Sequence, residues 1–466
     1  TTALVVGSVI GSGIFIVSAD IARTVRSPGL FFLVWIIAGV LSVIGALSYA
    51  ELSAAMPKAG GQYVYLREAY GKLPAFLFGW TFFLVIVTGI VAAVSVAFAK
   101  YLGIFIPAVS AKNIVFSVGP VGVSTQQLVA MMVVAVLTYI NCRGVKDGAR
   151  VQNLFTVLKC LAVVMLVIAG LTIGRNPQIM HTNFSNLFAG TSFGMSAITS
   201  IGAAMVGSLF AMDAWAYVCA TAAEVRNPQR NLPLALLFGT GSVALLYLIV
   251  NVAYMSVLPL FGDPAGADVM ARGIQYASED RVAAAVAQTI LGSAGLTAIV
   301  AAILISTFGC VNGNILMGSR MFYAMAQDGL FFKAVGRINP RTHVPTTALI
   351  VGGVWSCLLT LSGSYSQLLD YVIFATLVFY ILTIAGLMRL RKTKPDMPRP
   401  YRAWGYPWLQ IVYIVGASLI CIDLLIYKPA YTWPGLAIVL TGFPVYYIWR
   451  WRSERAGRLA ANCCAG

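Results

Sequence analysis

Three small residues interrupt an otherwise apolar stretch near the start of the chain. Residues 9–17 read VIGSGIFIV, with Gly-Ser-Gly at its centre. Glycine costs about 1 kcal/mol relative to alanine inside a helix, and lipid gives an exposed backbone no water as a substitute partner. A close-packing face, Gly7-x-x-x-Gly11, explains two of the glycines but not Ser12 or Gly13. We therefore favour an unwound segment over residues 10–14, whose free N–H groups bind an anion at the start of a half-helix.

An aspartate stands in a second apolar stretch, SLFAMDAWAY at residues 208–217. An ionisable side chain at the centre of a membrane helix costs about 2.5–3.5 kcal/mol. Asp213 should therefore face a cavity or a cation, or pair with a neighbouring helix. Phe210 and Trp215 flank it and are predicted to cover a pocket, with ordinary core packing as the alternative.

A lysine lies in a third apolar stretch, FTVLKCLAVVML at residues 155–166. Lys159 could extend its ammonium group to the membrane surface. Its position well inside the stretch favours a buried amine, which supplies a fixed positive charge near a broken helix or carries a proton.

The composition requires a membrane for these stretches. The 466 residues are 59% hydrophobic and 10% charged, whereas a soluble domain is about 45–50% apolar and about 25% charged. A membrane-spanning helix needs about 20 apolar residues. Such helices are predicted at 1–25, 30–56, 74–104, 124–142, 150–173, 196–224, 232–259, 288–326, 344–363, 366–390, 406–427 and 431–450.

The net charge of +16 follows from topology rather than from nucleic-acid binding. Most of the 31 Lys and Arg residues fall in connections on one side, which predicts a plasma or inner membrane protein with both termini in the cytoplasm. Glu51, at a predicted cytoplasmic end, should pair with basic loop residues. The chain begins at Thr1 without Met, so we expect a native N-terminal segment to precede it.

Other chemistries find little support. His181 and His343 are isolated, no Cys/His spacing suits a metal, and no Gly-x-x-x-x-Gly-Lys-Ser/Thr loop is present for a nucleotide. We therefore expect no metal and no cofactor. None of the eight cysteines falls in a predicted outer connection, so no disulfide to an extracellular partner is expected. Asn312-Gly313-Asn314 is predicted to break the eighth span, and its asparagines suit helix packing as well as a binding site.

A short sequence similarity links the first and sixth predicted spans. Residues 6–13 read VGSVIGSG and residues 206–213 read VGSLFAMD. An odd number of spans between them would place two repeats in opposite orientations, and interrupted helices at matching positions mark a midplane site.

Eight segments, taken in order, resemble a known family. The chain is similar to the amino acid–polyamine–organocation superfamily, most closely its L-type amino acid transporter branch and the bacterial relatives of that branch. The resembling segments are VGSVIGSGIF (6–15), SPG (27–29), GALSYAEL (45–52), AGGQYVYLREAYG (59–71), ARVQNLFTVLK (149–159), LFAMDAWAY (209–217), EVRNPQRNLPLA (224–235) and STFGCVNGN (306–314).

The resemblance implies an all-α integral membrane protein with twelve transmembrane helices and a leucine-transporter-like 5+5 inverted repeat, with helices 1 and 6 broken. Residues 1–390 would form the transport core, with spans 1–5 over about 1–173 and spans 6–10 over about 196–390. Residues 391–466 would supply spans 11 and 12 and a cytoplasmic tail.

The resemblance also implies roles for residues. The substrate carboxylate would meet N–H groups around Ser12, Gly13 and Ile14, and the amine would meet carbonyls near Val9, Ile10 and Phe210. The substrate-binding set is Val9, Ile10, Gly11, Ser12, Gly13, Ile14, Phe210, Ala211 and Asp213; Phe210 and Trp215 form the gate, and Lys159 takes the place where relatives bind sodium.

The chain departs from the family pattern at two places. Met212-Asp213-Ala214-Trp215 stands where many members have Tyr-Gly-Gly-Trp or Tyr-Asp-Gly-Trp, so the break lacks a glycine. Residues 105–125 contain no cysteine, whereas animal members join a glycoprotein heavy chain through one there. A protein that works without a disulfide-linked heavy chain is expected.

The predicted function is a sodium-independent secondary transporter of L-amino acids, an exchanger or facilitator, working by alternating access. The alternative is a proton- or sodium-coupled symporter of cationic amino acids or polyamines. The resemblance keeps a cationic substrate open because some relatives that accept cations carry Asp at the position of Asp213, and it keeps sodium open because Ser306 and Thr307 retain hydroxyls of the kind that bind sodium. A channel would need more polar pore-lining residues, a sensor usually adds a soluble domain, and no nucleophile or acid–base pair supports an enzyme.

Overall fold

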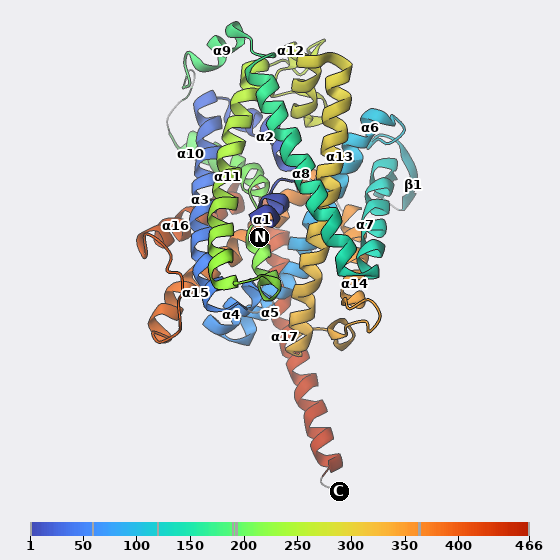
Figure 1. The fold of residues 1–466 in the computed structure, drawn as a ribbon, viewed down its shortest axis with the longest axis vertical. Helices are drawn as coiled ribbons and strands as arrows, with labels where there is room; N and C mark the ends of the chain where they lie inside the picture. Colours follow the sequence, from blue (N-terminus) through green and yellow to red (C-terminus); the bar gives the residue numbers. More distant parts are fainter. Residues whose placement is uncertain are drawn as a thin grey trace.

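The helices of the chain run side by side through one bundle, with α9 and α12 at one end and α4 near the other (Figure 1). The computed structural model describes residues 2–57, 60–118, 121–188, 191, 194–361 and 365–464. The first part comprises α1 (Thr2–Val9), α2 (Gly13–Val25), α3 (Pro28–Ala55), α4 (Gln62–Tyr70), α5 (Lys72–Thr81), the π-helical turn η1 (Phe82–Ile86), α6 (Val87–Phe105), β1 (Ile114–Val118), β2 (Val121–Ser124), α7 (Thr125–Arg143) and α8 (Val145–Leu171).

The second part is also helical. It comprises α9 (Pro177–Phe184), α10 (Met195–Ala211), η2 (Ala216–Glu224), α11 (Pro228–Val257), α12 (Val269–Arg272), η3 (Ser278–Asp280), α13 (Val282–Gln327), η4 (Lys333–Gly336), α14 (Thr346–Thr360), α15 (Tyr365–Thr393), α16 (Trp408–Tyr427) and α17 (Pro429–Cys464).

Many of these helices can cross a membrane. Among the described residues, seven helical segments are long and apolar enough, and the bent pair α1–α2 adds an eighth candidate. Three further helices, α8, α10 and α14, contain shorter apolar stretches, and the last predicted span falls on α17. Over the residues that the structure describes, each predicted span therefore coincides with one helix or with consecutive helical segments, and the chain is a multi-pass membrane protein.

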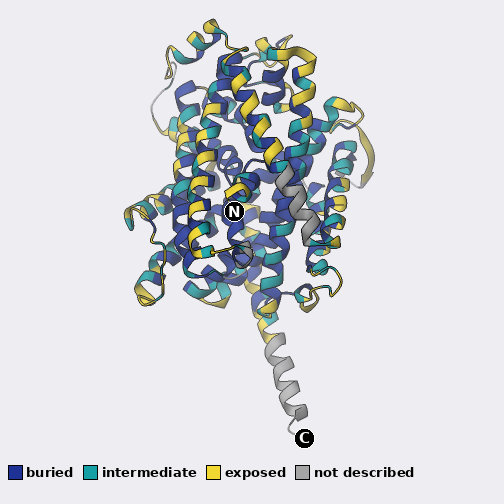
Figure 2. Ribbon diagram, viewed as in Figure 1, coloured by how far each residue is buried: buried dark blue, intermediate teal, exposed yellow. Residues whose placement is uncertain are grey.

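The surface of the bundle suits lipid. Burial is concentrated on the inward faces of the helices, and exposed residues alternate with buried ones along the outer helices (Figure 2). Large apolar side chains lie on the outside, such as Met165, Ile198 and Leu419, which are 57%, 65% and 61% exposed. An apolar surface of this kind is typical of a protein in contact with lipid rather than water, which agrees with the hydrophobic composition.

A β-hairpin corrects the all-α prediction. β1 and β2 pair antiparallel, with Phe116 opposite Val123 and Val118 opposite Val121. The hairpin lies in the connection between α6 and α7, outside the predicted spans. The sequence predicts only a connection here, although the run Ile-Val-Phe at 114–116 is rich in residues that favour strands.

The predicted break at residues 312–314 is wrong. α13 continues through this segment, and its kink lies earlier, at Gly292, where φ is 60°. Asn312 packs α13 against α7, since Asn141 Nδ2 donates to Asn312 Oδ1 at 2.8 Å, and Asn314 Nδ2 donates within α13 to the Cys310 carbonyl at 2.9 Å. Because these amides find partners inside the bundle, the helix has no reason to unwind.

The predicted pairing of Glu51 with basic residues is confirmed. Its side chain is fully buried and accepts hydrogen bonds from Arg391 at 2.9 and 2.5 Å and from the Ala403 N–H at 2.6 Å. Arg399 lies 3.5 Å away. This cluster ties the end of α3 to α15 and to the connection that follows it.

Candidate functional site

The first span is broken where the small residues predict it. α1 ends at Val9, α2 begins at Gly13, and the two helices are bent by 47°. Two glycines of this stretch also permit close packing, because a Cβ on Gly7 in α1 would lie 2.2 Å from Thr156 Oγ1 and one on Gly11 in the break would lie 3.0 Å from Cys310 Sγ. The break and the close packing are therefore both present, and Gly11 takes part in both.

The sixth span is broken at the same level. α10 ends at Ala211, and the chain resumes as the 3₁₀ helix η2 at Ala216. Ala214 lies between them with φ at 74°, a left-handed conformation that costs a non-glycine residue about 1–2 kcal/mol. The missing glycine therefore does not prevent the break, and the surrounding contacts hold alanine in a conformation that favours glycine.

The two breaks lie against each other. α2 packs along α10, and a Cβ on Gly13 would lie 2.6 Å from the Cα of Ala211. Between the breaks is a cavity of about 20 Å³, which is room for about one water molecule. Its lining is Ser8, Val9, Gly11, Ser12, Gly13, Ile90, Val94, Phe210, Ala211, Asp213, Ala214, Cys310 and Asn314.

Most of the predicted substrate-binding residues meet at this cavity. Ile10 and Ile14 do not line it; their side chains are fully buried, and their carbonyls accept hydrogen bonds from Lys159 and Tyr254. The predicted substrate-binding set leaves out six lining residues: one on α1, one in the break of the sixth span, two on α6 and two on α13. They are Ser8, Ala214, Ile90, Val94, Cys310 and Asn314.

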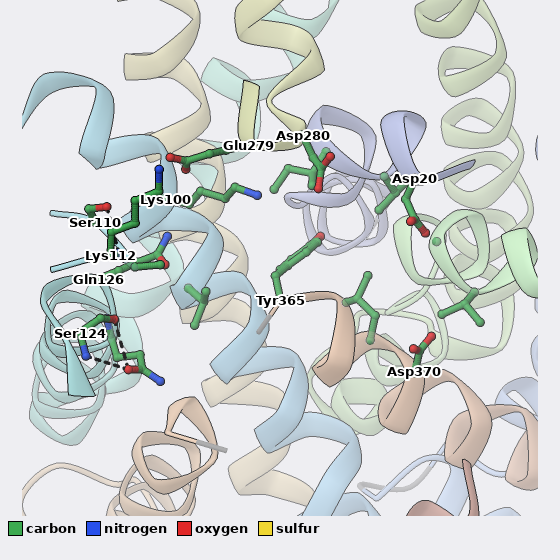
Figure 3. A pocket seen from close by; sticks show the side chains of 18 of the residues that line it. Asp20, Lys100, Ser110, Lys112, Ser124, Gln126, Glu279, Asp280, Tyr365 and Asp370 are labelled. Carbon is green, nitrogen blue, oxygen red and sulfur yellow. Dashed lines mark hydrogen bonds between the residues drawn. The ribbon is translucent and has the colours of Figure 1, made fainter. Parts of the chain in front are cut away.

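Two aromatic rings cover the cavity on one side. Tyr365, at the start of α15, has its hydroxyl 3.0 Å from Ser12 Oγ, and its ring meets Phe210 edge to face at 6.1 Å. Tyr365 also lines a larger cavity of about 570 Å³ beyond it, which we call the vestibule (Figure 3). Phe210 and Tyr365 therefore separate the small cavity from the vestibule. Nothing in the sequence around Tyr365 signals this position.

Trp215 lies away from the cavity lining. It is 1% exposed and packs against Tyr49 and Tyr380, with ring centroids 5.1 Å apart in each pair. It follows Phe210 along the broken span, on the opposite side of the break from the vestibule. The two predicted gate residues therefore belong to two separate aromatic clusters.

Asp213 is held by two tyrosines. Tyr217 donates to Oδ2 at 2.8 Å and Tyr380 donates to Oδ1 at 2.6 Å, and the side chain is 6% exposed. A carboxylate has about four acceptor positions, so two hydrogen bonds leave capacity toward the cavity that Asp213 lines.

Lys159 reaches the break of the first span from α8. Its ammonium donates to the carbonyls of Gly7 and, at 2.8 Å, of Ile10, and the side chain is 1% exposed. The ammonium group is thus inside the bundle, at the carbonyl end of α1, where the helix dipole favours a cation. Ser306 Oγ lies 3.5 Å from the same Ile10 carbonyl.

One family matches nearly the whole chain. The family described as amino acid permease matches residues 1–448. The chain belongs to this family. The predicted resemblance to the amino acid–polyamine–organocation superfamily and its L-type branch is confirmed.

Similar proteins of known activity extend over almost the whole length of this permease. It is 29% identical to the mouse b(0,+)-type amino acid transporter 1, covering 96% of this chain and 85% of the relative. It is 30% identical to the human cystine/glutamate transporter, covering 96% and 83%, and 30% identical to the mouse large neutral amino acids transporter small subunit 2, covering 96% and 79%. The family and these relatives are transporters, not enzymes.

Proposed function

We propose that this permease is a sodium-independent secondary transporter of L-amino acids, an exchanger or facilitator that works by alternating access. The observation that carries the proposal is the pair of adjacent helix breaks beside one small cavity. Twelve spans arranged as two inverted repeats of five, with two spans added, would place the breaks at matching positions of the two repeats.

The substrate's charged groups would bind to backbone. The first N–H groups of α2, around Ser12, Gly13 and Ile14, have no partner within the helix and lie at its positive end, which suits a carboxylate. The amine would meet carbonyls near Val9 and Phe210. The Ile10 carbonyl faces two donors, Lys159 at 2.8 Å and Ser306 at 3.5 Å. The Val9 carbonyl accepts from Tyr247 at 3.3 Å and the Phe210 carbonyl from the Asp213 N–H at 3.2 Å. A carbonyl oxygen has two lone pairs, so these two carbonyls each keep one acceptor position for the amine.

Sodium independence is supported by Lys159. Its ammonium supplies a positive charge to the carbonyl end of α1. Ser306 Oγ lies 3.5 Å from the Ile10 carbonyl to which Lys159 donates, so a sodium ion held by this hydroxyl would lie close to the like charge of the ammonium group. In this arrangement the lysine takes the place of a metal ion.

Exchange in liposomes tests the proposal. Purified protein is reconstituted, and uptake of labelled alanine, leucine and arginine is followed in sodium-free buffer, with and without unlabelled amino acids inside. Uptake that needs internal amino acid establishes exchange, and uptake into empty liposomes without any ion gradient establishes a facilitator. Uptake that needs a sodium or proton gradient contradicts the proposal and favours the symporter.

Asp213 keeps a preference for cationic substrates open, because it is a carboxylate on the cavity wall. We predict that Asp213→Asn raises the KM for arginine about tenfold and the KM for leucine much less, since only arginine carries a second positive charge. Uptake kinetics for both substrates measure this. Tyr380→Phe is the control, because it removes one hydrogen bond to Asp213 and keeps the charge. Equal changes for both substrates would assign Asp213 to structure.

The topology and partners complete the proposal. The protein would lie in the plasma or inner membrane. Both of its termini would be on the cytoplasmic side, because the connections rich in Lys and Arg lie on the same side as the termini. The permease would work without a disulfide-linked heavy chain, because residues 105–125 lack a cysteine. Blue native electrophoresis with and without reductant would test this in native membranes.

A further inference from the structure

The surface where α15 ends and α16 begins carries an excess of positive charge. Residues 389–408 contain six basic side chains and one acidic side chain. The single carboxylate of Glu51 faces both Arg391 and Arg399, so positive charge exceeds negative charge even in this buried cluster. Lys394 pairs with Glu68 at 2.7 Å. The basic residues of this surface are Arg389, Arg391, Lys392, Lys394, Arg399 and Arg402.

Two cations of this surface are free. Lys392 and Arg402 are both exposed, and among the residues that the structure describes neither side chain forms an ion pair or a hydrogen bond. Each is the chain neighbour of a residue that Glu51 holds, because Arg391 and the Ala403 N–H both donate to its carboxylate. The cluster at Glu51 therefore brings Lys392, on α15, and Arg402, in the connection to α16, to the same end of the bundle.

Two tryptophans beside these cations mark the level of the membrane surface. Trp404 and Trp408 are 75% and 73% exposed, and Trp408 is the first residue of α16. Tryptophan is enriched where membrane helices cross the headgroup region, because its ring is apolar and its N–H is polar. Arg402 lies two positions before Trp404 in the chain, so its guanidinium group is at the depth of the lipid phosphates.

An apolar stripe continues from Trp408 along the outer face of α16. Val412, Val415 and Leu419 follow Trp408 at helical spacing, and all three are exposed. At a rise of 1.5 Å per residue, the stripe from Trp408 to Leu419 is about 16 Å long. One leaflet contributes half of a hydrocarbon core of about 30 Å, so the stripe matches the length of one acyl chain. Positive charge at one end and an apolar stripe below it are the two features that a phospholipid complements.

We propose that this surface binds an anionic phospholipid of the leaflet in which α16 begins, which is the cytoplasmic leaflet in the proposed topology. The phosphate contacts Lys392 and Arg402, and an acyl chain follows the stripe on α16. Basic residues next to a membrane helix attract acidic lipids, and the stripe favours a lipid over an acidic protein or a nucleic acid. A lipid bound there joins α15 to the start of α16, and a ligand that binds only the folded protein raises its stability. The site is independent of what the protein transports.

Lipid titration of the purified full chain tests the site. Phosphatidylglycerol or phosphatidylcholine with identical acyl chains is added to the protein in a neutral detergent; native mass spectrometry measures the bound lipid, and heating measures the Tm. Phosphatidylglycerol should bind about tenfold more tightly than phosphatidylcholine and raise the Tm more. Lys392→Gln/Arg402→Gln should lose this preference and keep the affinity for phosphatidylcholine. Glycerol 3-phosphate, which has the phosphate without acyl chains, should leave the Tm unchanged.

Two further variants separate charge from position. Lys392→Arg/Arg402→Lys keeps both charges and should keep the preference for phosphatidylglycerol. Lys333→Gln/Arg341→Gln removes one exposed lysine and one exposed arginine from the connection between α13 and α14, on the other side of the bundle from α16 (Figure 1), and should bind lipid like wild type. Equal affinity of the wild-type protein for both lipids overturns the site, as does an unchanged preference in Lys392→Gln/Arg402→Gln or an equal loss in Lys333→Gln/Arg341→Gln. An acidic protein that co-purifies on this surface in place of the lipid would also overturn it.

Discussion

Replacing Lys159 with methionine is expected to reduce amino acid uptake by about ten- to a hundredfold while the protein still inserts and purifies. The ammonium group donates to the carbonyls of Gly7 and Ile10. Methionine fills a similar volume and donates nothing, so two buried carbonyls at the end of α1 lose their charged donor. Hydrogen bonds to charged groups contribute about 1.5–3 kcal/mol, and each 1.4 kcal/mol corresponds to about tenfold in an equilibrium.

The comparison with other variants shows whether the charge matters. Lys72→Met, on the exposed end of α5, should transport like wild type. Lys159→Arg should also fail, because a planar guanidinium cannot take the place of a compact ammonium group between two carbonyls. Initial uptake rates in proteoliposomes, normalised to the amount of reconstituted protein, provide the measurement. A Lys159→Met protein with wild-type rates across the pH range would remove this residue from the mechanism.

The positions of the two breaks could be predicted because each break contains residue types that are unusual in an apolar helix. Gly11, Ser12 and Gly13 are poor helix formers in a stretch that lipid would otherwise make helical, and Asp213 marks the second break by its charge. Lys159 was recognisable for the same reason. A polar or small residue in an apolar segment stands out before any neighbour is known.

The rest of the site depends on which helix faces meet. Ile90 and Val94 are ordinary apolar residues of α6, and they differ from many others only because α6 packs against α13 beside the breaks. Tyr365 becomes important through a contact with Ser12, which is 353 positions away in the chain. No local pattern contains such a pairing.

The wrong prediction at Asn312 and Asn314 has the same origin. Polar residues in a span can mark a break or can pack one helix against another. Asn141, on α7, provides the partner that decides the outcome at Asn312, and it is 171 positions away. Ala214 illustrates the reverse case, because packing holds a backbone conformation that its residue type disfavours.

Gly13→Ala is expected to reduce transport at least tenfold through a single added methyl group. The new Cβ would lie 2.6 Å from both the Cα and the Cβ of Ala211. Part of this contact is backbone, so no side chain can rotate away, and α2 and α10 must separate. Overpacking of this kind costs about 1–3 kcal/mol, and it falls on the contact that shapes the cavity between the breaks.

Gly241→Ala is the matched control for the same substitution. Gly241 lies within α11, and a Cβ there meets no heavy atom within 4 Å. Alanine is the better helix former by about 1 kcal/mol, so this variant should fold and transport at least as well as wild type. Uptake rates and binding of labelled leucine to the solubilised proteins compare the two. Wild-type binding and uptake by Gly13→Ala would mean that substrate does not use the space where α2 meets α10, and the proposed position of the carboxylate would then be wrong.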